Sequence, residues 1–108
     1  MYMKSDTLSS MISRQSAKIF AWDKGNISKN WLKHKVDTTE AEEVFFDLSK
    51  LEFGDPTHSS LETRHIVIGK TKRGRMLYIA YTLRNNRIRI ISARDINSKE
   101  RKLYEKSS

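Results

Sequence analysis

The chain has 108 residues with 21 Lys and Arg against 13 Asp and Glu, a formal net charge of +8, and no cysteine. This length suits one domain with a modest core. The absence of cysteine excludes a disulfide framework, a thiolate metal site and a cysteine nucleophile. The positive charge favours a polyanion, chiefly nucleic acid, although an acidic protein partner or an anionic membrane would also satisfy it. No apolar run approaches the ~18 residues that span a bilayer, and no signal-peptide pattern is present, so we expect a cytoplasmic protein.

The N-terminal part of the chain divides into an extension and the start of a folded domain. Residues 1–17 are polar and serine-rich, which favours a flexible extension, and residues 18–108 form the domain. Residues 18–22 are aromatic and β-favouring, which predicts a first strand. Asp23 then caps a predicted helix. One face of that helix carries Ile27, Asn30, Trp31 and His34.

A second helix is predicted from a capping box. Asp37 is followed three positions later by Glu40, the pattern in which each residue's side chain bonds the other's backbone N–H. Apolar residues at helical spacing then predict the buried stripe, namely Ala41, Val44, Phe45 and Leu48.

From Leu51 onward the apolar period changes to two, which is typical of strands. The predicted strands are residues 51–53, 64–70, 75–83 and 87–94, separated by a loop at 54–60 and by turns at 71–74 and 84–86. Short turns between consecutive strands predict an antiparallel meander. Asn97 and Glu100 predict a last helix that packs through Leu103 and Tyr104. The predicted fold class is therefore α+β, an antiparallel meander sheet with two helices preceding and one helix following.

The strand at 87–94 carries the strongest pattern. Regular alternation assigns Arg87, Arg89, Ile91 and Ala93 to one face and Ile88, Ile90, Ser92 and Arg94 to the other. Because the adjacent isoleucines point in opposite directions, the middle of the strand is expected to be covered on both sides. The same alternation delivers Arg94 to a charged surface at the end of the strand.

Several short motifs at fixed spacings resemble the BrnT family of bacterial toxins. They are Trp22-Asp23, Asn30, Lys33-His34, Val36, Glu43-Val44-Phe45, Asp55-Pro56-x-His58, Glu62-x-Arg64, Ile68-Gly69, Gly74-Arg75, Thr82, the 87–94 strand, Glu100 and Tyr104. The resemblance covers about residues 18–105. The sequence departs from the family pattern at Lys24, Asn26 and Lys35, the last standing where a helix C-cap glycine is usual.

The resemblance implies a RelE-like fold and a ribonuclease that cuts messenger RNA and arrests translation. It also implies a cognate antitoxin of the BrnA type, which carries a DNA-binding ribbon-helix-helix region. Operator DNA would then be bound only through the antitoxin.

The residues themselves point to nuclease chemistry without a metal. The histidines are far apart in sequence and no paired-carboxylate or HExxH motif is present, so no metal site or cofactor is predicted. The remaining route is attack of an RNA 2′-OH on the adjacent phosphate. That reaction needs a base, an acid and fixed positive charge, and the planar fork of arginine suits phosphate oxygens best.

Candidate site residues follow from these requirements. The predicted catalytic residues are His34, Glu62, Arg64 and Arg94, and the predicted substrate-binding residues are Lys33, Arg75, Arg89 and Tyr104. Structural alternatives stay open for several of them. Arg94 would then pair with Glu62 or Glu100, and the side chain of His34 would interact with the end of its helix.

Two other functions remain open from the sequence. One is a basic nucleic-acid-binding domain without catalysis, although no RNP aromatics, GXXG loop or helix-turn-helix signal is present. The other is a domain whose basic face mainly binds an antitoxin.

Overall fold

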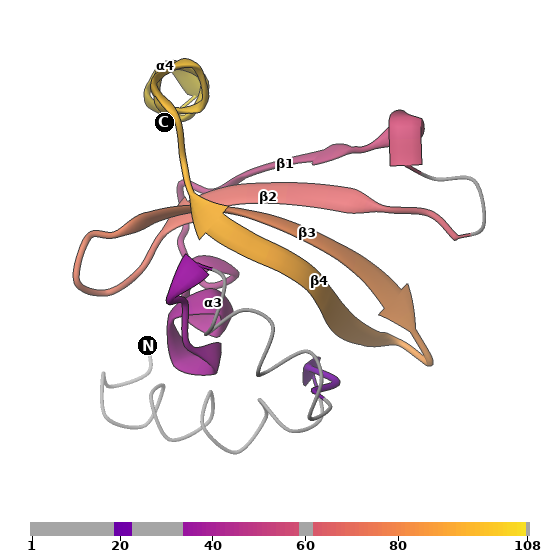
Figure 1. Ribbon diagram of the computed structural model, residues 1–108. Helices are drawn as coiled ribbons and strands as arrows, with labels where there is room; N and C mark the ends of the chain where they lie inside the picture. The colour runs from indigo at the N-terminus through magenta and orange to yellow at the C-terminus, as the bar shows by residue number, and fades with distance from the viewer. Residues whose placement is uncertain (1–18, 23–33, 59–61, 108) are drawn as a thin grey trace, which may run out of the picture.

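The computed structural model describes residues 19–22, 34–58 and 62–107. Its elements are α3 (Thr38–Val44), β1 (Leu51–Gly54), the 3-10 turn η1 (Pro56–His58), β2 (His65–Lys70), β3 (Met76–Arg84), β4 (Arg87–Asp95) and α4 (Ser98–Ser107). The strands form one antiparallel sheet in the order β1-β2-β3-β4. Helix α3 lies on one side of this sheet and α4 on the other (Figure 1). The predicted α+β meander is therefore confirmed.

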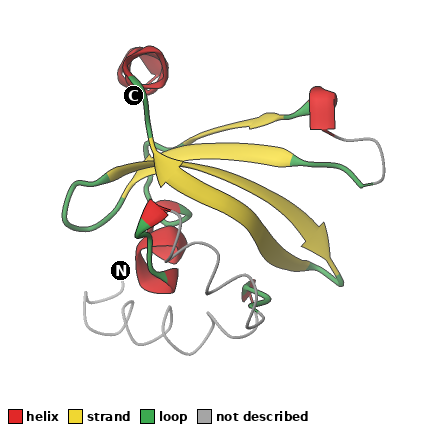
Figure 2. Cartoon of the chain, viewed as in Figure 1, coloured by secondary structure: helices red, strands yellow, loops and turns green. Residues whose placement is uncertain are grey.

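The predicted arrangement of helices is not confirmed. The described residues contain one helix before the sheet and one after it (Figure 2). The other predicted helix falls on residues 24–34, of which only His34 is described, so Trp31 lies outside the described residues. The predicted extension at 1–17 also lies outside them. Among the described residues, no helix is both long enough and apolar enough to cross a membrane.

Helix α3 begins at the predicted capping box. The Glu40 N–H donates to Asp37 Oδ1 over 2.7 Å, and the Asp37 N–H donates to Glu40 Oε1 over 3.2 Å. Ala41 and Val44 are buried as predicted. The prediction for Leu48 was wrong, because the helix ends at Val44 and the chain then turns, which leaves this leucine fully exposed.

The face of the sheet under α3 carries the larger core. Its buried residues are Phe20, Val36, Ala41, Val44, Val67, Leu77, Ile79, Tyr81, Ile90 and Ala93. The predicted strand at 18–22 was wrong for its described residues. Phe20 forms only an isolated parallel bridge with Ile88 of β4, supported by the Ala21 N–H donating to the Ile88 carbonyl over 2.8 Å.

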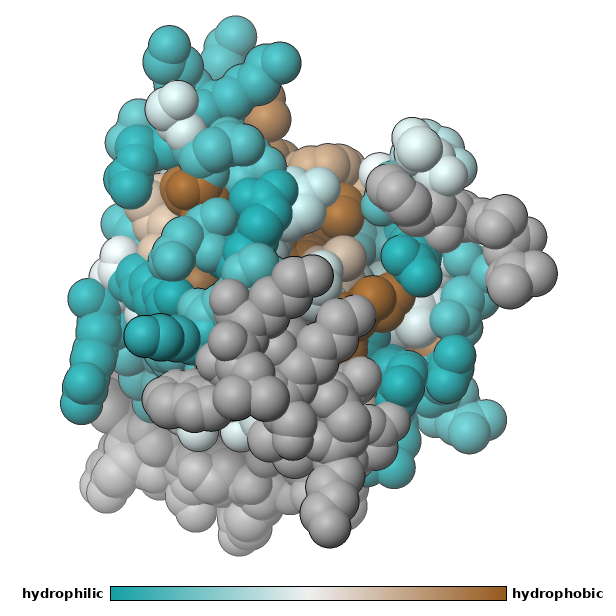
Figure 3. Space-filling model, viewed as in Figure 1, coloured by the Kyte–Doolittle hydropathy of each residue, from teal (hydrophilic) through white to brown (hydrophobic). Residues whose placement is uncertain are grey.

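The face under α4, called here the α4 face, is only partly covered. Its buried cluster consists of Ile66, Ile68, Met76, Ala80 and Tyr104. Of the predicted apolar contacts of this helix, Tyr104 is buried, whereas Leu103 is 47% exposed. Helix α4 crosses one end of the sheet, and no other described helix lies on the rest of this face (Figure 1). Figure 3 shows hydrophobic surface in the space between α4 and η1, with hydrophilic side chains on either side.

A β-bulge in β4 changes which side chains share a face. Ala80 pairs with Ser92 and the next residue, Tyr81, pairs with Ile90, so Ile91 is an extra residue without a partner on β3. The regular alternation predicted for this strand holds through Ile91 and was wrong from Ser92 onward. The middle of the strand is nevertheless covered on both sides, because Ile90 packs in the α3-side core and Ile91 packs against the α4-side cluster.

The bulge places two basic residues on the same face. Arg89 pairs with Thr82 and Arg94 pairs with Tyr78, and these β3 residues point to the same side as Ala80 of the α4-side cluster. Five positions along a regular strand would have put the two arginines on opposite faces. The extra residue brings both onto the α4 face.

Helix α3 packs so closely on β2 that adding one methyl group at the contact should destabilise the domain. A Cβ at Gly69 would lie 2.8 Å from Val44 Cγ1 and 3.1 Å from the Val44 carbonyl oxygen, whereas a Cβ at Gly54 would meet nothing within 4 Å. We expect Gly69→Ala to lower the free energy of unfolding by about 1–3 kcal/mol and Gly54→Ala to change it by less than about 0.5 kcal/mol. Urea denaturation followed by circular dichroism measures both. Equal stabilities would contradict this packing.

Candidate functional site

The sheet register arranges the α4 face in rows that run across the strands. One row, the proximal row, lies next to the Lys70–Met76 pair that contacts α4 and consists of Leu51, Ile68, Tyr78 and Arg94. The next, the central row, consists of Phe53, Ile66, Ala80 and Ser92. The proximal row thus ends in a basic residue on the edge strand β4, whereas the central row is apolar apart from one hydroxyl.

Arg94 is held in a defined orientation. Its guanidinium stacks on the Tyr78 ring at 4.0 Å from the centroid. Nη1 and Nη2 donate to the two carboxylate oxygens of Glu100 over 2.9 and 2.8 Å. Of the structural alternatives, the ion pair with Glu100 is thus the one that forms. The arginine side chain keeps 37% exposure, so the fork is fixed by helix α4 yet still reaches solvent.

A second charged group, the distal group, lies beyond the central row. It consists of Glu62, Arg64, Arg84 and Arg89, with Glu62 accepting from the Arg84 guanidinium over 3.0 and 3.2 Å. The hydrogen bond from Arg84 lowers the pKa of Glu62, and the positive charges of Arg64 and Arg89 lower it further. Three arginines thus surround one carboxylate near the β3–β4 hairpin. The turn of this hairpin has positive φ at Asn85 and Asn86, 52° and 62°, a conformation that asparagine tolerates.

The predicted catalytic residues therefore fall into two places. Tyr78 of the proximal row and Thr82, the partner of Arg89, are four positions apart on β3, which corresponds to about 13 Å along the strand. The Arg94 fork is turned toward Glu100 on α4 and away from the distal group, so the two are not placed around one phosphate. They can hold different phosphates of one extended strand of nucleic acid.

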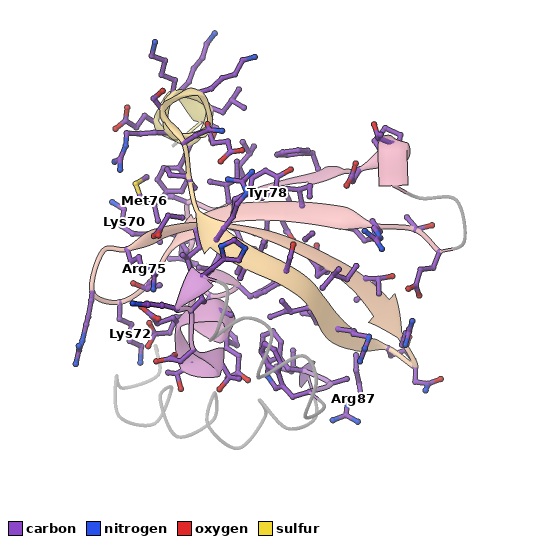
Figure 4. The ribbon with its side chains drawn as sticks, in the orientation of Figure 1. Lys70, Lys72, Arg75, Met76, Tyr78 and Arg87 are labelled. Carbon is purple, nitrogen blue, oxygen red and sulfur yellow. The ribbon has the colours of Figure 1, made fainter. Side chains whose placement is uncertain are left out.

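Arg75 is a structural clamp. Its Nε and Nη2 donate to the two carboxylate oxygens of Asp95 over 2.8 and 3.1 Å. Nη1 donates to the Lys35 carbonyl over 2.8 Å and to Glu40 over 3.1 Å, and Nη2 also donates to the His34 carbonyl over 3.2 Å. These bonds engage all five N–H donors of a guanidinium, and the bond with Asp95 raises the Arg75 pKa. In Figure 4, Arg75 lies beside α3, whereas Met76 and Tyr78 lie toward α4.

His34 lies next to this clamp. The hydrogen bond from Arg75 is the largest cause that lowers the pKa of Asp95, and a positive charge on His34 lowers that pKa further. Asp95 also follows Arg94, whose Nη1 donates to the Asp95 carbonyl over 3.1 Å. The structure thus brings His34 and Arg94 to the same end of the edge strand β4, His34 from the α3 side of the sheet and Arg94 from the α4 side. The neighbouring candidate Lys33 lies outside the described residues.

Lys35 keeps the backbone shape of a glycine C-cap. Its φ is +55°, a left-handed conformation that costs non-glycine residues roughly 1–2 kcal/mol. The departure from the family pattern at this position therefore leaves the turn in place. We expect Lys35→Gly to raise the free energy of unfolding by about 1 kcal/mol, measured by urea denaturation. Lys72→Gly, at another exposed position, gives the comparison, and a stability loss in Lys35→Gly would contradict the explanation.

Tyr104 serves to attach α4. Its hydroxyl donates to Asp47 Oδ2 over 2.7 Å, its ring lies 5.8 Å from Lys70 Nζ, and its side chain is buried. Burial, together with the bond to Asp47, raises the pKa of Tyr104 to about 12. Asp47 also accepts the Lys70 N–H over 2.8 Å, so this contact ties the helix to the end of β2.

Removing the Arg75 clamp should destabilise the domain. We expect Arg75→Ala to lower the free energy of unfolding by about 2–3 kcal/mol, somewhat less than the ~3–5 kcal/mol for a fully buried ion pair, because the side chain is 27% exposed. Arg73→Ala, which removes the same charge from an exposed position in the same hairpin, should change stability by less than about 0.5 kcal/mol. Urea denaturation at pH 7 measures both.

The contribution of the clamp should depend on pH in a defined direction. The pKa of Asp95 is lowered from its usual 3.8, so the stabilisation is fully present above that value and is lost as pH falls through the lowered pKa. The stability difference between wild type and Asp95→Asn should therefore be constant from pH 5 to 7 and shrink below about pH 4. A difference that grows on acidification would contradict this assignment.

Sequence reasoning missed four partners, which belong to Arg94, the distal group and the Arg75 clamp. They are Tyr78 beneath Arg94, Arg84 beside Glu62, and the carboxylates Glu40 and Asp95 around Arg75. Each contact joins residues from different elements or from paired strands. Strand register would have found Tyr78 and Asp95, and the packing of α3 and of the segment before β2 against the sheet would have found Glu40 and Arg84.

The fold and the site together define a small basic α+β domain with a partly open sheet face suited to a phosphate-bearing ligand. Residues 22–100 match the family model for BrnT, described as the ribonuclease toxin of type II toxin–antitoxin systems. The chain therefore belongs to the BrnT family, as its motifs suggested. A toxin of this type works with an antitoxin, so membership implies such a partner. A comparison with curated proteins gave no match.

Proposed function

We propose that the protein is an endoribonuclease that cleaves messenger RNA by metal-independent transesterification and thereby inhibits translation in the cytoplasm. The observation that carries this proposal is the pair of arginine groups on the open α4 face, with Arg94 at one end and Arg64 and Arg89 at the other. Membership of a ribonuclease toxin family supports it.

In this proposal the reaction takes place at the end of β4, where His34 and Arg94 flank Asp95. The RNA 2′-OH attacks the adjacent phosphorus, the bond to the 5′-oxygen breaks, and a 2′,3′-cyclic phosphate and a 5′-hydroxyl are formed. Arg94 stabilises the negative charge that accumulates on the phosphorane oxygens. His34 takes or supplies a proton, because imidazole can do either near neutral pH.

The distal group then holds a neighbouring phosphate. Glu62 is a poor proton acceptor at pH 7, because the Arg84 hydrogen bond lowers its pKa. In this proposal Glu62 therefore positions the surrounding arginines, and Arg64 and Arg89 contact the RNA backbone. Arg75 and Tyr104 support the site through the contacts described above rather than by binding substrate.

The proposed partner is an antitoxin of the BrnA type, a ribbon-helix-helix protein that neutralises the toxin and binds operator DNA on behalf of the complex. The net charge of +8 suits an acidic segment of such a partner. A gene for a small protein directly beside the gene for this chain would support the pairing. Failure of that neighbour to bind the purified toxin would contradict it.

The test of the catalytic proposal uses purified protein, labelled single-stranded RNA and EDTA. We expect cleavage with cyclic phosphate ends, undiminished by the chelator. Cleavage that EDTA abolishes would contradict the metal-independent mechanism. Tight RNA binding without cleavage would favour the second candidate, a binding domain, which is consistent with the occupation of the Arg94 fork by Glu100.

A further inference from the structure

The central row of the α4 face is apolar although charged groups lie on both sides of it. Phe53 is 40% exposed on the edge strand β1, next to Ile66 and Ala80, which are 2% and 8% exposed. The row ends in Ser92 on β4. An exposed phenylalanine alone needs no explanation. Here it lies beside small side chains, between Arg94 on one side and the distal group on the other.

Positive charge, an apolar row and positive charge follow one another on this face, and a single-stranded nucleic acid presents phosphates and bases in the matching order. Its phosphates are anionic and its unstacked bases present flat apolar faces, which proteins bind by stacking on aromatic side chains within a basic surface. The two arginine sites are about 13 Å apart along the sheet, and the central row lies between them. Ile66 and Ala80 are buried, so the exposed ring of Phe53 is the apolar part of this row that a base can reach.

We propose that the central row is a nucleobase subsite, in which Phe53 stacks on a base of single-stranded RNA that lies between the phosphates held by Arg94 and by the distal group. This inference rests on the proposed function and adds the form of the substrate to it. The RNA must be locally unpaired, because a base in a duplex cannot reach the ring. Phe53 is a substrate-positioning residue that takes no part in proton transfer.

The choice of RNA over a protein side chain rests on charge. A protein segment would satisfy the apolar row equally well, but the arginines on the two sides of the row favour a ligand that carries an anion at each of these positions. Arg64 and Arg89 supply positive charge on the distal side of the row, whereas Arg87 donates to the Phe20 carbonyl on the α3 side of the sheet. A strand of RNA supplies anions and apolar faces in alternation.

The test measures binding separately from cleavage. The probe is a fluorescein-labelled 2′-O-methyl RNA of about twelve nucleotides, which lacks the attacking hydroxyl, and each nucleotide in turn is replaced by an abasic one. For wild type we expect one or two adjacent positions at which loss of the base weakens binding about 5- to 100-fold, the usual effect of one stacked base. Phe53→Ala should bind the intact RNA correspondingly more weakly and should not respond to the abasic replacement at those positions.

Two further variants make the result specific. Phe53→Trp should restore the sensitivity to the missing base, because its ring can stack. Phe46→Ala removes a phenylalanine of similar exposure, 38%, from the end of α3, where it lies near Phe20. It should leave RNA affinity unchanged.

The possible failures are distinguishable. An abasic penalty in Phe53→Ala equal to that of wild type, or no penalty in wild type at any position, would overturn the subsite and leave the proposed ribonuclease function standing. An unchanged RNA affinity in Phe53→Ala together with a weakened antitoxin complex would overturn it in favour of a protein interface. Absence of any RNA binding or cleavage by wild type would contradict the proposed function and the subsite with it.

Discussion

Ile79→Ala should lower the free energy of unfolding by about 2–5 kcal/mol. Ile79 lies at the middle of β3, pairs with Val67 on one side and Ala93 on the other, and all three are fully buried under α3. The neighbours belong to paired strands that cannot move inward independently, so the cavity left by the truncated side chain will not collapse. Such a loss is a large fraction of the 5–15 kcal/mol that stabilises a typical domain.

The matched control for this variant is Leu83→Ala. Leu83 lies on the same strand but is 55% exposed near the hairpin, and its truncation should cost less than about 0.5–1 kcal/mol. Urea denaturation curves of the two variants and the wild type measure the difference. Similar losses in both would show that the α3-side core does not dominate stability.

Arg94→Ala should reduce RNA cleavage by roughly 10²-fold, the usual effect of removing one group that stabilises transition-state charge. Arg94→Lys should restore only part of the activity, since an ammonium group keeps the charge but loses the planar fork. Lys102→Ala, which removes the same charge from an exposed position on α4, should retain full activity. Initial cleavage rates on a labelled RNA at saturating protein provide the measurement.

Glu100→Gln separates a catalytic Arg94 from a purely structural one. Glu100 accepts hydrogen bonds from both terminal nitrogens of Arg94. Both Glu100→Gln and Arg94→Ala therefore break the ion pair and loosen the start of α4. If Arg94 acts only through this pair, the two variants should lose activity equally. If Arg94 holds the phosphate, Glu100→Gln should keep or increase RNA affinity while Arg94→Ala loses it. Equal losses of activity in the two variants would therefore contradict the placement of Arg94 in the site.

Much of the fold could be predicted from local patterns. The capping boxes at Asp37–Glu40 and Asn97–Glu100 each specify their own helix start through contacts within four residues. The alternating apolar residues and the short turns likewise specify a meander through residues that are close together in the sequence. The motifs likewise identified the family correctly, because an ordered set of residues is specific even where each fragment is common.

The site could be predicted only in its parts. Arg94 lies near the end of β4 as predicted, but its neighbours depend on the pairing of β3 with β4, where a bulge shifts the register. Arg75 was grouped with substrate contacts, whereas its fork is engaged by carboxylates and carbonyls from three other segments. Contacts of this kind depend on tertiary packing, which no local pattern contains.

The bulge in β4 also determines where this strand tolerates a change in length. Removing Ile91 would leave Ile90 and Ser92 adjacent and already on opposite sides of the sheet, so every flanking side chain would keep its face. Removing one residue elsewhere between Arg87 and Arg94 would turn part of the strand over and expose Ile90 or bury an arginine. Insertions and deletions among related chains should therefore collect at this one position.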